Sequence, residues 1–350
     1  MDIKDIIFDI FKELKYSTNL TTYKYKCRKI TLYDLLLNTH EGSPYHKEGS
    51  FLKHLEMVYD ISKIFYDLEL SIACLLHDIG KPFCRFYDTE KNVTRFNGHE
   101  SLSVFIAIDV LDILTKDEKY KDIDKIRILK LIQRHADPYK FSKEKLLKLY
   151  TKSEMQDVCR IHFCDTKGRL PEKEPTLIDI SDFEFIKEPK YTSSKMFVVL
   201  HGVPCSGKST YIETLNKSEN LTEYEKNFKD FRVLSRDEIV MKFAELNNLT
   251  YKKSFDKFKD KINKEYQKRF SELKYCDIIV DGTNISEKSR RKFKNRNVLV
   301  ITFLVGFNEI FKRNSKRLNK KLENYVIINF MKNFQFVYSG EGFVNTFKNI

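Results

Sequence analysis

The spacing of apolar residues changes about halfway along the 350-residue chain. From the start to about residue 170, apolar residues recur mainly at helical spacing, as in FLKHLEMVYDISKIFYDL from Phe51, without convincing strand alternation. After about residue 195, short apolar runs alternate with charged helical segments; the runs are MFVVLHG from Met196, CDIIVDGT from Cys276 and NVLVITFLVG from Asn297. The first pattern predicts a helical domain, and the second predicts an α/β domain with buried parallel strands.

The two patterns meet in a segment rich in Pro, Glu and Asp, LPEKEPTLIDISDFEFIKEPK, where helical periodicity fades. A chain of this length is expected to form more than one domain. We therefore predict a multidomain fold, with an all-α domain over residues 1–175, a linker over residues 176–194 and an α/β domain over residues 195–350.

Composition and charge indicate the partners and the cellular location of the protein but not the reaction that it catalyses. The 63 Lys and Arg residues exceed the 50 Asp and Glu residues, which favours polyanionic partners such as nucleic acid, although solvated helix surfaces explain the excess equally well. None of the seven cysteines forms a CxxC pair, as expected for reduced thiols. The N-terminus lacks signal-peptide features, and no run reaches about 18 apolar residues, so we expect a cytoplasmic protein without a membrane partner.

A phosphate-binding motif follows the first apolar run of the second half. The run MFVVLHGVPCSGKST contains a complete GxxxxGKS between a predicted strand and a predicted helix. In such loops backbone N–H groups wrap a polyphosphate, Lys208 reaches the β- and γ-phosphates, and Ser209 ligates Mg²⁺. A glycine-rich turn is the alternative. The predicted nucleotide and Mg²⁺ site comprises Gly202, Ser206, Gly207, Lys208, Ser209 and Thr210.

Three further segments carry charged residues at places where open α/β sheets build their sites. RVLSRDEIV places Asp237 just after a short predicted strand, and CDIIVDGTN places Asp281 at the carboxyl end of another. FNEIFKRNSKRL puts Arg313 and Arg317 one turn apart on a predicted basic helix. Taken alone, Asp237 is interpreted as the N-cap of the following helix, and the arginines as a solvated face.

Together the GxPxSGKST loop and the SRD, DxTN and KRNSKR segments resemble the 5′-kinase domain of the phage and bacterial polynucleotide kinases, across about 150 residues. The resemblance implies a P-loop kinase fold with a parallel sheet and a helical lid, and ATP as the donor. It implies that Asp237 accepts the proton of a 5′-hydroxyl, and that Arg313 and Arg317 close on the transferring phosphates. Asp281 would support Mg²⁺ through water or orient the acceptor.

One position departs from the phage pattern. The phage kinase has an arginine three residues beyond the general base that contacts the acceptor's phosphate, and here that position is Val240. Unless Arg236 or Lys242 substitutes, this charge-assisted contact is absent. We therefore expect a 3′-phosphate on a mononucleotide acceptor to matter little; a simple core role for Val240 is compatible with this.

The helical half carries an ordered set of histidines and aspartates. The order, His then His-Asp then His, His and Asp, resembles the HD phosphohydrolase superfamily over roughly residues 40–170. Imidazole with carboxylate suits one or two divalent transition metals such as Mn²⁺, Co²⁺ or Ni²⁺, and an aspartate beside a ligating histidine can bridge two ions. The six residues are His54, His77, Asp78, His99, His135 and Asp165.

We infer that His54, His77, Asp78 and Asp165 form one ion site, and that Asp78, His99 and His135 form a second. Such ions activate a bound water and clamp a phosphate oxygen, so Asp78 counts as catalytic as well as ligating. Any one of these histidines alone is more often an ordinary side chain than a ligand. Lys81, Lys167 and Arg169 are close enough in sequence to these ligands to reach a bound phosphate, and ordinary exposed cations are the alternative. Weaker claims belong to His40, His46, His162 and His201.

An HD domain followed by a P-loop kinase resembles the bacterial HD-Pnk end-healing proteins. The resemblance implies a bifunctional enzyme in which the kinase transfers the ATP γ-phosphate to 5′-hydroxyl ends of RNA or DNA. The HD domain would hydrolyse 2′,3′-cyclic or terminal 2′/3′-phosphates, with a nucleic-acid ligase acting downstream. Two alternatives stay open: an HD nucleotidase fused to a small-molecule or nucleoside kinase, and a nucleic-acid-binding regulatory module with vestigial sites.

Overall fold

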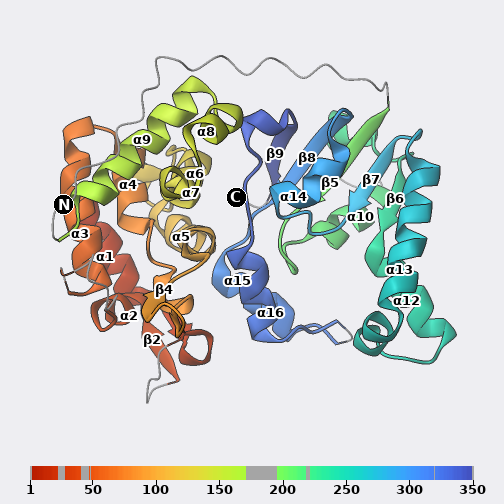
Figure 1. Cartoon of the computed structure of the whole chain (residues 1–350), viewed down its shortest axis with the longest axis horizontal. Helices are drawn as coiled ribbons and strands as arrows, with labels where there is room; N and C mark the ends of the chain where they lie inside the picture. Colours follow the sequence, from red (N-terminus) through yellow and green to blue (C-terminus); the bar gives the residue numbers. More distant parts are fainter. Residues whose placement is uncertain are drawn as a thin grey trace. The chain divides into compact units, whose positions relative to one another are not determined.

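A computed structural model of the chain (Figure 1) describes residues 2–22, 28–40, 47, 49–170, 195–217, 221–318 and 320–348. The chain forms two compact units. The helical unit comprises Met1–Ile186, Gly306–Asn308 and Ile328–Gly340, and the sheet unit comprises Lys187–Val305, Glu309–Ile327 and Glu341–Ile350. The predicted linker and His46 lie outside the described residues, and the predicted domain boundaries stay predictions.

Helices form most of the helical unit. Side-chain caps start several of them, including a capping box in which Thr151 and Glu154 each accept from the other's backbone N–H. The helices at the centre are buried on nearly every side, which explains why their sequences are apolar throughout. In chain order the helices are α1 (Ile3–Glu13), α2 (Leu32–Leu37), α3 (Phe51–Ser62), α4 (Leu68–Leu76), α5 (His99–Leu114), α6 (Lys125–Arg134), α7 (Asp137–Lys140), α8 (Lys143–Leu149) and α9 (Lys152–Lys167).

Two short antiparallel strand pairs interrupt the helices and were not expected from the sequence. One pair joins β1 (Lys15–Ser17) to β2 (Lys29–Thr31), and the other joins β3 (Phe86–Asp88) to β4 (Val93–Arg95). Each strand has three residues, so it is too short to show the alternation by which a strand is recognised.

Part of the helical unit comes from the C-terminal end of the chain. The carbonyl of Phe334 accepts hydrogen bonds from Ser101 Oγ at 2.6 Å and from Gln133 Nε2 at 2.9 Å, and Gln133 Oε1 accepts from the backbone N–H of Phe336 at 2.7 Å. The Phe334 ring also packs on Phe105. Residues 328–340 therefore belong to the core of the helical unit, although they lie far from it in the sequence.

The sheet unit contains a five-stranded sheet in the order β6-β7-β5-β8-β9, with every neighbouring pair parallel. The predicted fold class, a helical region followed by a P-loop type α/β domain with a parallel sheet, is confirmed. The strands are β5 (Met196–His201), β6 (Arg232–Ser235), β7 (Ile278–Asp281), β8 (Asn297–Phe303) and β9 (Val344–Lys348). The helices in this part of the chain are α10 (Lys208–Lys217), α11 (Glu223–Lys226), α12 (Arg236–Leu246), α13 (Tyr251–Leu273), α14 (Glu287–Arg290), α15 (Phe307–Ser315) and α16 (Asn324–Lys332). The first two residues of α15 and residues 328–332 of α16 belong to the helical unit.

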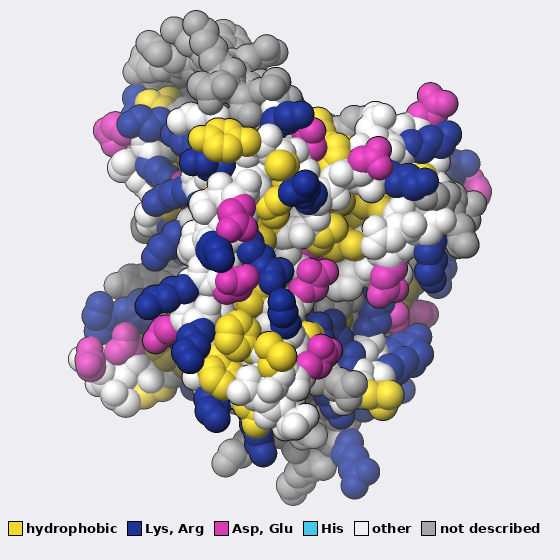
Figure 2. All heavy atoms as spheres, turned by 90° about the vertical axis from the view of Figure 1, so that its right-hand side faces the viewer, with side chains coloured by type: hydrophobic (Ala, Val, Ile, Leu, Met, Phe, Trp, Pro, Cys, Tyr) yellow, Lys and Arg dark blue, Asp and Glu magenta, His cyan; other side chains and the backbone are white. Residues whose placement is uncertain are grey.

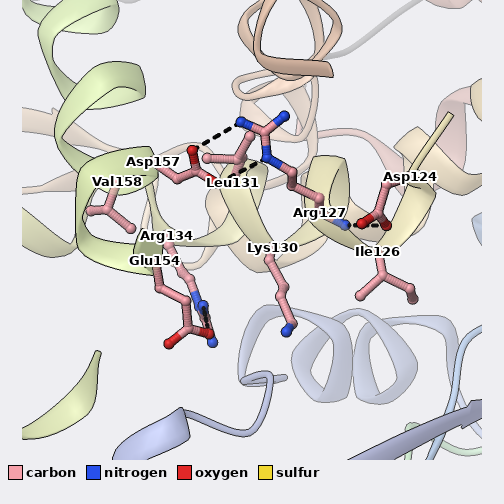
Figure 3. A pocket seen from close by; sticks show the side chains of 9 residues that line it. All are labelled: Asp124, Ile126, Arg127, Lys130, Leu131, Arg134, Glu154, Asp157 and Val158. Atoms are coloured by element: carbon pink, nitrogen blue, oxygen red, sulfur yellow. Dashed lines mark hydrogen bonds and ion pairs between the residues drawn. The ribbon is translucent and has the colours of Figure 1, made fainter. Parts of the chain in front are cut away.

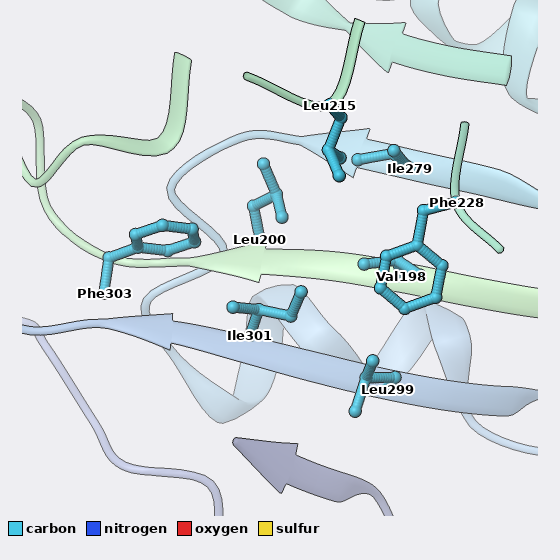
Figure 4. Close-up of a cluster of buried hydrophobic side chains, with 8 residues drawn as sticks. All are labelled: Val198, Leu200, Leu215, Phe228, Ile279, Leu299, Ile301 and Phe303. Atoms are coloured by element: carbon cyan, nitrogen blue, oxygen red, sulfur yellow. The ribbon is translucent and has the colours of Figure 1, made fainter. Parts of the chain in front are cut away.

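The central strand β5 determines where the sheet unit can bind a ligand. Its side chains Val198 and Leu200 pack with residues of β7, β8, α10 and the loop before β6 (Figure 4). From β5 the chain continues first to strands on one side and later to strands on the other. In open α/β sheets such a switch point leaves a crevice at the carboxyl ends of the strands, which is where the phosphate-binding motif lies. Among the described residues no helix combines the length and apolarity needed to cross a membrane.

Candidate phosphate and metal sites

Lys208 lies at the start of α10, directly after the loop that follows β5. The residue is 8% exposed, and its ammonium donates to the carbonyls of Gly202 and Val203, each at 2.8 Å, and to Ser206 Oγ at 3.3 Å. Burial lowers the pKa of Lys208 to about 8, while the nearby carboxylates act in the opposite direction. The loop thus holds a desolvated cation on neutral oxygens, which favours an anionic ligand.

The backbone of this loop requires its glycines. Gly207 has φ +106°, in the region that side chains disfavour. A Cβ on Gly202 would lie 2.7 Å from Ser206 Oγ and 2.9 Å from the carbonyl oxygen of Phe303. Ser209 and Thr210 lie exposed in the first turn of α10. The structure therefore brings all six predicted phosphate-binding residues together in one loop and helix start.

Asp237 lies in the first turn of α12, and its carboxylate does not cap the helix. The cap is Ser235, whose Oγ accepts from the backbone N–H of Glu238 at 3.4 Å. Asp237 Oδ1 instead accepts from the hydroxyl of Tyr251 at 2.7 Å, and Oδ2 lies 3.6 Å from Lys320 Nζ. The Asp237 side chain is 54% exposed, so an acceptor hydroxyl can reach it. The interpretation of Asp237 as an N-cap is wrong.

Asp281 ends β7 and is joined to the same helix start. Ser235 Oγ donates to Asp281 Oδ2 at 3.1 Å, which connects the carboxyl ends of β6 and β7. Burial raises the pKa of Asp281, and Lys208 partly opposes this effect. The carboxylate is therefore partly desolvated beside the loop lysine, as suits a group that supports a cation through water.

The two predicted lid arginines differ in position. Arg313 lies in the last turn of α15, where Nε donates to Glu309 Oε1 at 3.0 Å and Nη1 donates to the loop carbonyl of Cys205 at 3.3 Å. Arg317 lies beyond the end of α15 at Ser315, and its Nη1 donates to the carbonyl of Lys320 at 3.4 Å. The prediction that both arginines share one helix is wrong, because α15 ends at Ser315, two residues before Arg317.

Tyr251 and Lys320 are the neighbours of Asp237 that sequence reasoning missed. Tyr251 begins α13, and its pKa is raised by burial and by the Asp237 carboxylate, so it remains a hydrogen-bond donor. Lys320 follows the basic segment after α15 and also lies over the Tyr251 ring. The excess of lysine near residue 320 was the available signal, but nothing in the sequence distinguished this lysine from the others.

The six predicted metal ligands gather in the helical unit in two overlapping groups. In the first, ligand atoms of His54, His77, Asp78 and Asp165 lie within 4.8 Å of one another; Asp78, His99 and His135 do the same in the second. His54 Nε2 is 3.2 Å from Asp165 Oδ1, and His77 Nε2 is 3.2 Å from Asp78 Oδ2. These two groups are the ones inferred from the sequence, and Asp78 belongs to both.

Backbone carbonyls orient three of the histidine rings. Nδ1 of His77, His99 and His135 lies 2.8, 2.8 and 2.7 Å from the carbonyl oxygen three residues earlier in each case. In the neutral form of each ring, Nδ1 therefore carries the proton, and the lone pair of Nε2 faces the carboxylates. A metal-ligating histidine commonly has its second nitrogen fixed in this way.

The donor set fits a divalent cation. Within the described part of the chain, His77 Nε2 and Asp78 Oδ1 are buried without a hydrogen-bond partner, although each faces other potential ligand atoms. Burial would lower the pKa of His77, but Asp78 and Asp165 outweigh it and raise that pKa to about 9. Burial lowers the pKa of His135 to about 3. Convergent lone pairs on buried nitrogen and oxygen atoms are what a transition metal binds.

Two cations border this cluster. Lys81 Nζ lies 2.7 Å from Asp78 Oδ2. Arg169 donates from Nη2 to the Asp165 carboxylate and from Nε to the backbone carbonyl of Asp165. Both contact carboxylates of the cluster, so both can neutralise the charge of a phosphate held beside it. Lys167 is half-buried.

Residues 51–177 match the HD domain family, and residues 197–334 match an AAA domain family. The chain joins an HD domain to a P-loop kinase-like domain. No curated protein matches the chain. An HD domain with this histidine and aspartate cluster indicates divalent metal binding, and a P-loop domain indicates binding of ATP and Mg²⁺. Both domains therefore indicate enzymatic activity, hydrolytic in one and kinase-like in the other.

A pocket elsewhere in the helical unit, at α6 and α9, is lined by equal numbers of cationic and carboxylate side chains (Figure 3). Arg127 Nε donates to Asp157 at 2.9 Å, and Arg134 Nη1 donates to Glu154 at 3.1 Å. Among the described lining residues the cations Arg127, Lys130 and Arg134 are matched by the carboxylates Asp124, Glu154 and Asp157. The balance favours neither phosphate nor cation, and we assign the pocket no function.

Proposed function

We propose that the chain is a bifunctional end-healing enzyme for RNA or DNA. The P-loop domain phosphorylates 5′-hydroxyl ends, and the HD domain hydrolyses 2′,3′-cyclic or terminal 2′/3′-phosphates, so that a nucleic-acid ligase can join the ends. The observation that carries the proposal is Asp237. Its carboxylate is exposed, is not used as a helix cap, and is oriented by Tyr251 and Lys320 at the start of α12.

In the kinase site each residue has a distinct part. Asp237 would accept the proton of the attacking 5′-hydroxyl, and Lys208 would leave its loop carbonyls for the β- and γ-phosphates. Arg313, which already contacts the loop carbonyl of Cys205, would stabilise charge on the transferring phosphoryl group. Ser209 would ligate the Mg²⁺ of Mg²⁺-ATP, which neutralises the phosphate oxygens when bound.

In the HD site the protein supplies oriented and buried ligand atoms. The ring positions of His77, His99 and His135 are set by backbone carbonyls, and Asp78 is positioned to belong to both ligand groups. Bound divalent cations would lower the pKa of a water molecule and draw a phosphate oxygen toward it. Lys81 would assist by holding the charge of the substrate phosphate.

The proposal is tested by incubating the purified protein with labelled ATP and with oligonucleotides that end in a 5′-hydroxyl or a 2′,3′-cyclic phosphate. We expect label to appear on the 5′ end and the cyclic phosphate to disappear. Nucleosides and mononucleotides are assayed in parallel. Label on these small acceptors with none on oligonucleotides would favour the nucleoside kinase alternative and contradict end healing.

We expect the two activities to require different metals. The oxygen ligands of the kinase site suit Mg²⁺, whereas the histidine-rich HD cluster suits softer ions. After removal of metal, Mg²⁺ with ATP should restore phosphorylation, and Mn²⁺, Co²⁺ or Ni²⁺ should restore phosphoesterase activity. Full phosphoesterase activity with Mg²⁺ alone would count against the proposed ligands.

Val240 adds a prediction about the acceptor. Its side chain is fully buried among Leu234, Ile239, Ile262 and Tyr266, so it points into the core between α12 and α13. We therefore expect a nucleoside and its 3′-monophosphate to be phosphorylated with similar kcat/KM. Val240→Arg, which would place an unpaired charge in this core, should unfold the domain rather than create a phosphate contact. A strong preference for the 3′-monophosphate would show that another cation contacts that phosphate.

A further inference from the structure

Helix α13 carries a stripe of lysines on its exposed side. Ser254, Ile262 and Tyr266 are buried against α12 and β6. The stripe consists of Lys253, Lys257, Lys261, Lys264 and Lys268, all exposed.

Spacing places these five lysines in a row. Before the kink at Phe258, Lys253 and Lys257 are four positions apart, and after it Lys261, Lys264 and Lys268 follow at three and four positions, so each of the two sets has the repeat of one helix face. At 1.5 Å per residue the row is about 22 Å long with roughly 5 to 6 Å between neighbours. This step is comparable with the separation of successive phosphates along an extended single strand.

The lysines of the stripe are available for a ligand. Within the part of the chain that the structure describes, none of the five forms a salt bridge. Lys257 and Lys261 lie over the ring of Phe258, where the helix is kinked, at 5.3 and 5.8 Å from its centroid. The face of the molecule in Figure 2 shows many Lys and Arg side chains, with Asp, Glu and hydrophobic side chains among them.

The stripe starts at the end of α13 that contacts the proposed general base, although Tyr251 itself lies on the face that packs on α12. Tyr251, the first residue of α13, donates to Asp237, and Lys253 follows two residues later. A 5′-terminal hydroxyl held at Asp237 is therefore at the end of the row nearest Lys253. The phosphates that follow it along the strand can run toward Lys268.

We propose that the α13 lysine stripe binds the sugar–phosphate backbone of the acceptor strand and makes the kinase select acceptors by length. The inference rests on the proposed kinase function. It also fits the burial of Val240: with no cation at that position, binding energy must come from phosphates farther along the strand. Exposed lysines and phosphates interact without reading bases, so selection depends on length and not on sequence.

The test compares 5′-hydroxyl acceptors of one to eight nucleotides. In the wild type, we expect the first 3′-phosphate to change kcat/KM little, each of about the next four phosphates to raise it, and further phosphates to add nothing. In the variant with Lys257, Lys261, Lys264 and Lys268 all changed to Gln, the increase in kcat/KM between the shortest and the longest acceptor should be at least tenfold smaller. The KM for ATP should stay the same. The matched control changes four exposed lysines outside α12 and α13 to Gln: Lys226, Lys229, Lys288 and Lys294.

Oligonucleotide binding without ATP gives a readout that does not require catalysis. Each phosphate contact contributes about −0.7 to the slope of log K against log salt for single strands, so the stripe variant should lose a slope of roughly 2 to 3. If the salt slope and the length dependence were unchanged in the stripe variant, or equally reduced in the control variant, the proposal that the stripe binds the acceptor strand would be wrong. If no acceptor is phosphorylated but the stripe still determines the salt slope, the kinase proposal fails and the binding surface stands.

Discussion

Lys208→Ala is expected to abolish phosphorylation of 5′-hydroxyl ends and to leave cyclic-phosphate removal intact. The ammonium of Lys208 is buried in the phosphate-binding loop, so alanine removes the cation that faces the β- and γ-phosphates. We expect kcat to fall by about 100-fold or more, in the range found when one charge-stabilising group is deleted. Asp237→Ala should give the same pattern through loss of the proton acceptor.

The reverse pattern is expected for Asp78→Ala and His77→Ala. Asp78 belongs to both ligand groups, so its loss should weaken binding of both ions, and phosphoesterase activity should become undetectable while 5′-phosphorylation continues. Metal content by mass spectrometry and both activities are measured on each variant. Lys217→Ala, at an exposed lysine of α10, and His40→Ala, at an exposed histidine, serve as controls. A folded single variant that lost both activities would refute two separate sites.

Motif order explains why so much of both sites could be predicted. In a P-loop the strand, glycines, lysine and helix are consecutive, so MFVVLHGVPCSGKST determines the local geometry that the structure shows. The metal ligands are distant in sequence, but most of them lie in or next to helices that the apolar spacing predicts. Their grouping around Asp78 followed from the HD resemblance, because spacing alone does not bring helices together.

The failures share a physical cause, since each depends on contacts between segments that the local pattern does not encode. Whether Asp237 caps α12 is decided by Ser235, which takes the cap position and at the same time bonds Asp281 on a neighbouring strand. Arg317 has helical spacing from Arg313, yet α15 ends at Ser315. Helical periodicity shows which positions share a face but not where the helix stops.

Residues 328–340 lead to the second large expected effect, which concerns stability. Phe334 is fully buried in the helical unit, where its ring packs at 5.2 Å from both Phe105 and Phe336 and its carbonyl accepts from Ser101 and Gln133. A short distance along the segment, Arg134 Nη2 donates to the carbonyl of Val337 at 3.2 Å. The segment thus holds the end of α6, and the residue after α6 is the metal ligand His135.

Phe334→Ala should therefore destabilise the helical unit by about 3 to 5 kcal/mol, the usual cost of removing a buried phenylalanine ring. For a unit of this size we expect the phosphoesterase to be inactivated at a temperature lower by roughly 10 °C. Asn333→Ala, at the exposed neighbouring position, is the control and should change little. Both activities are followed during the same heating series. If Phe334→Ala lowered the inactivation temperature of the kinase and left that of the phosphoesterase unchanged, residues 328–340 would be stabilising the sheet unit instead, because a core residue of the helical unit must affect the site that this unit carries.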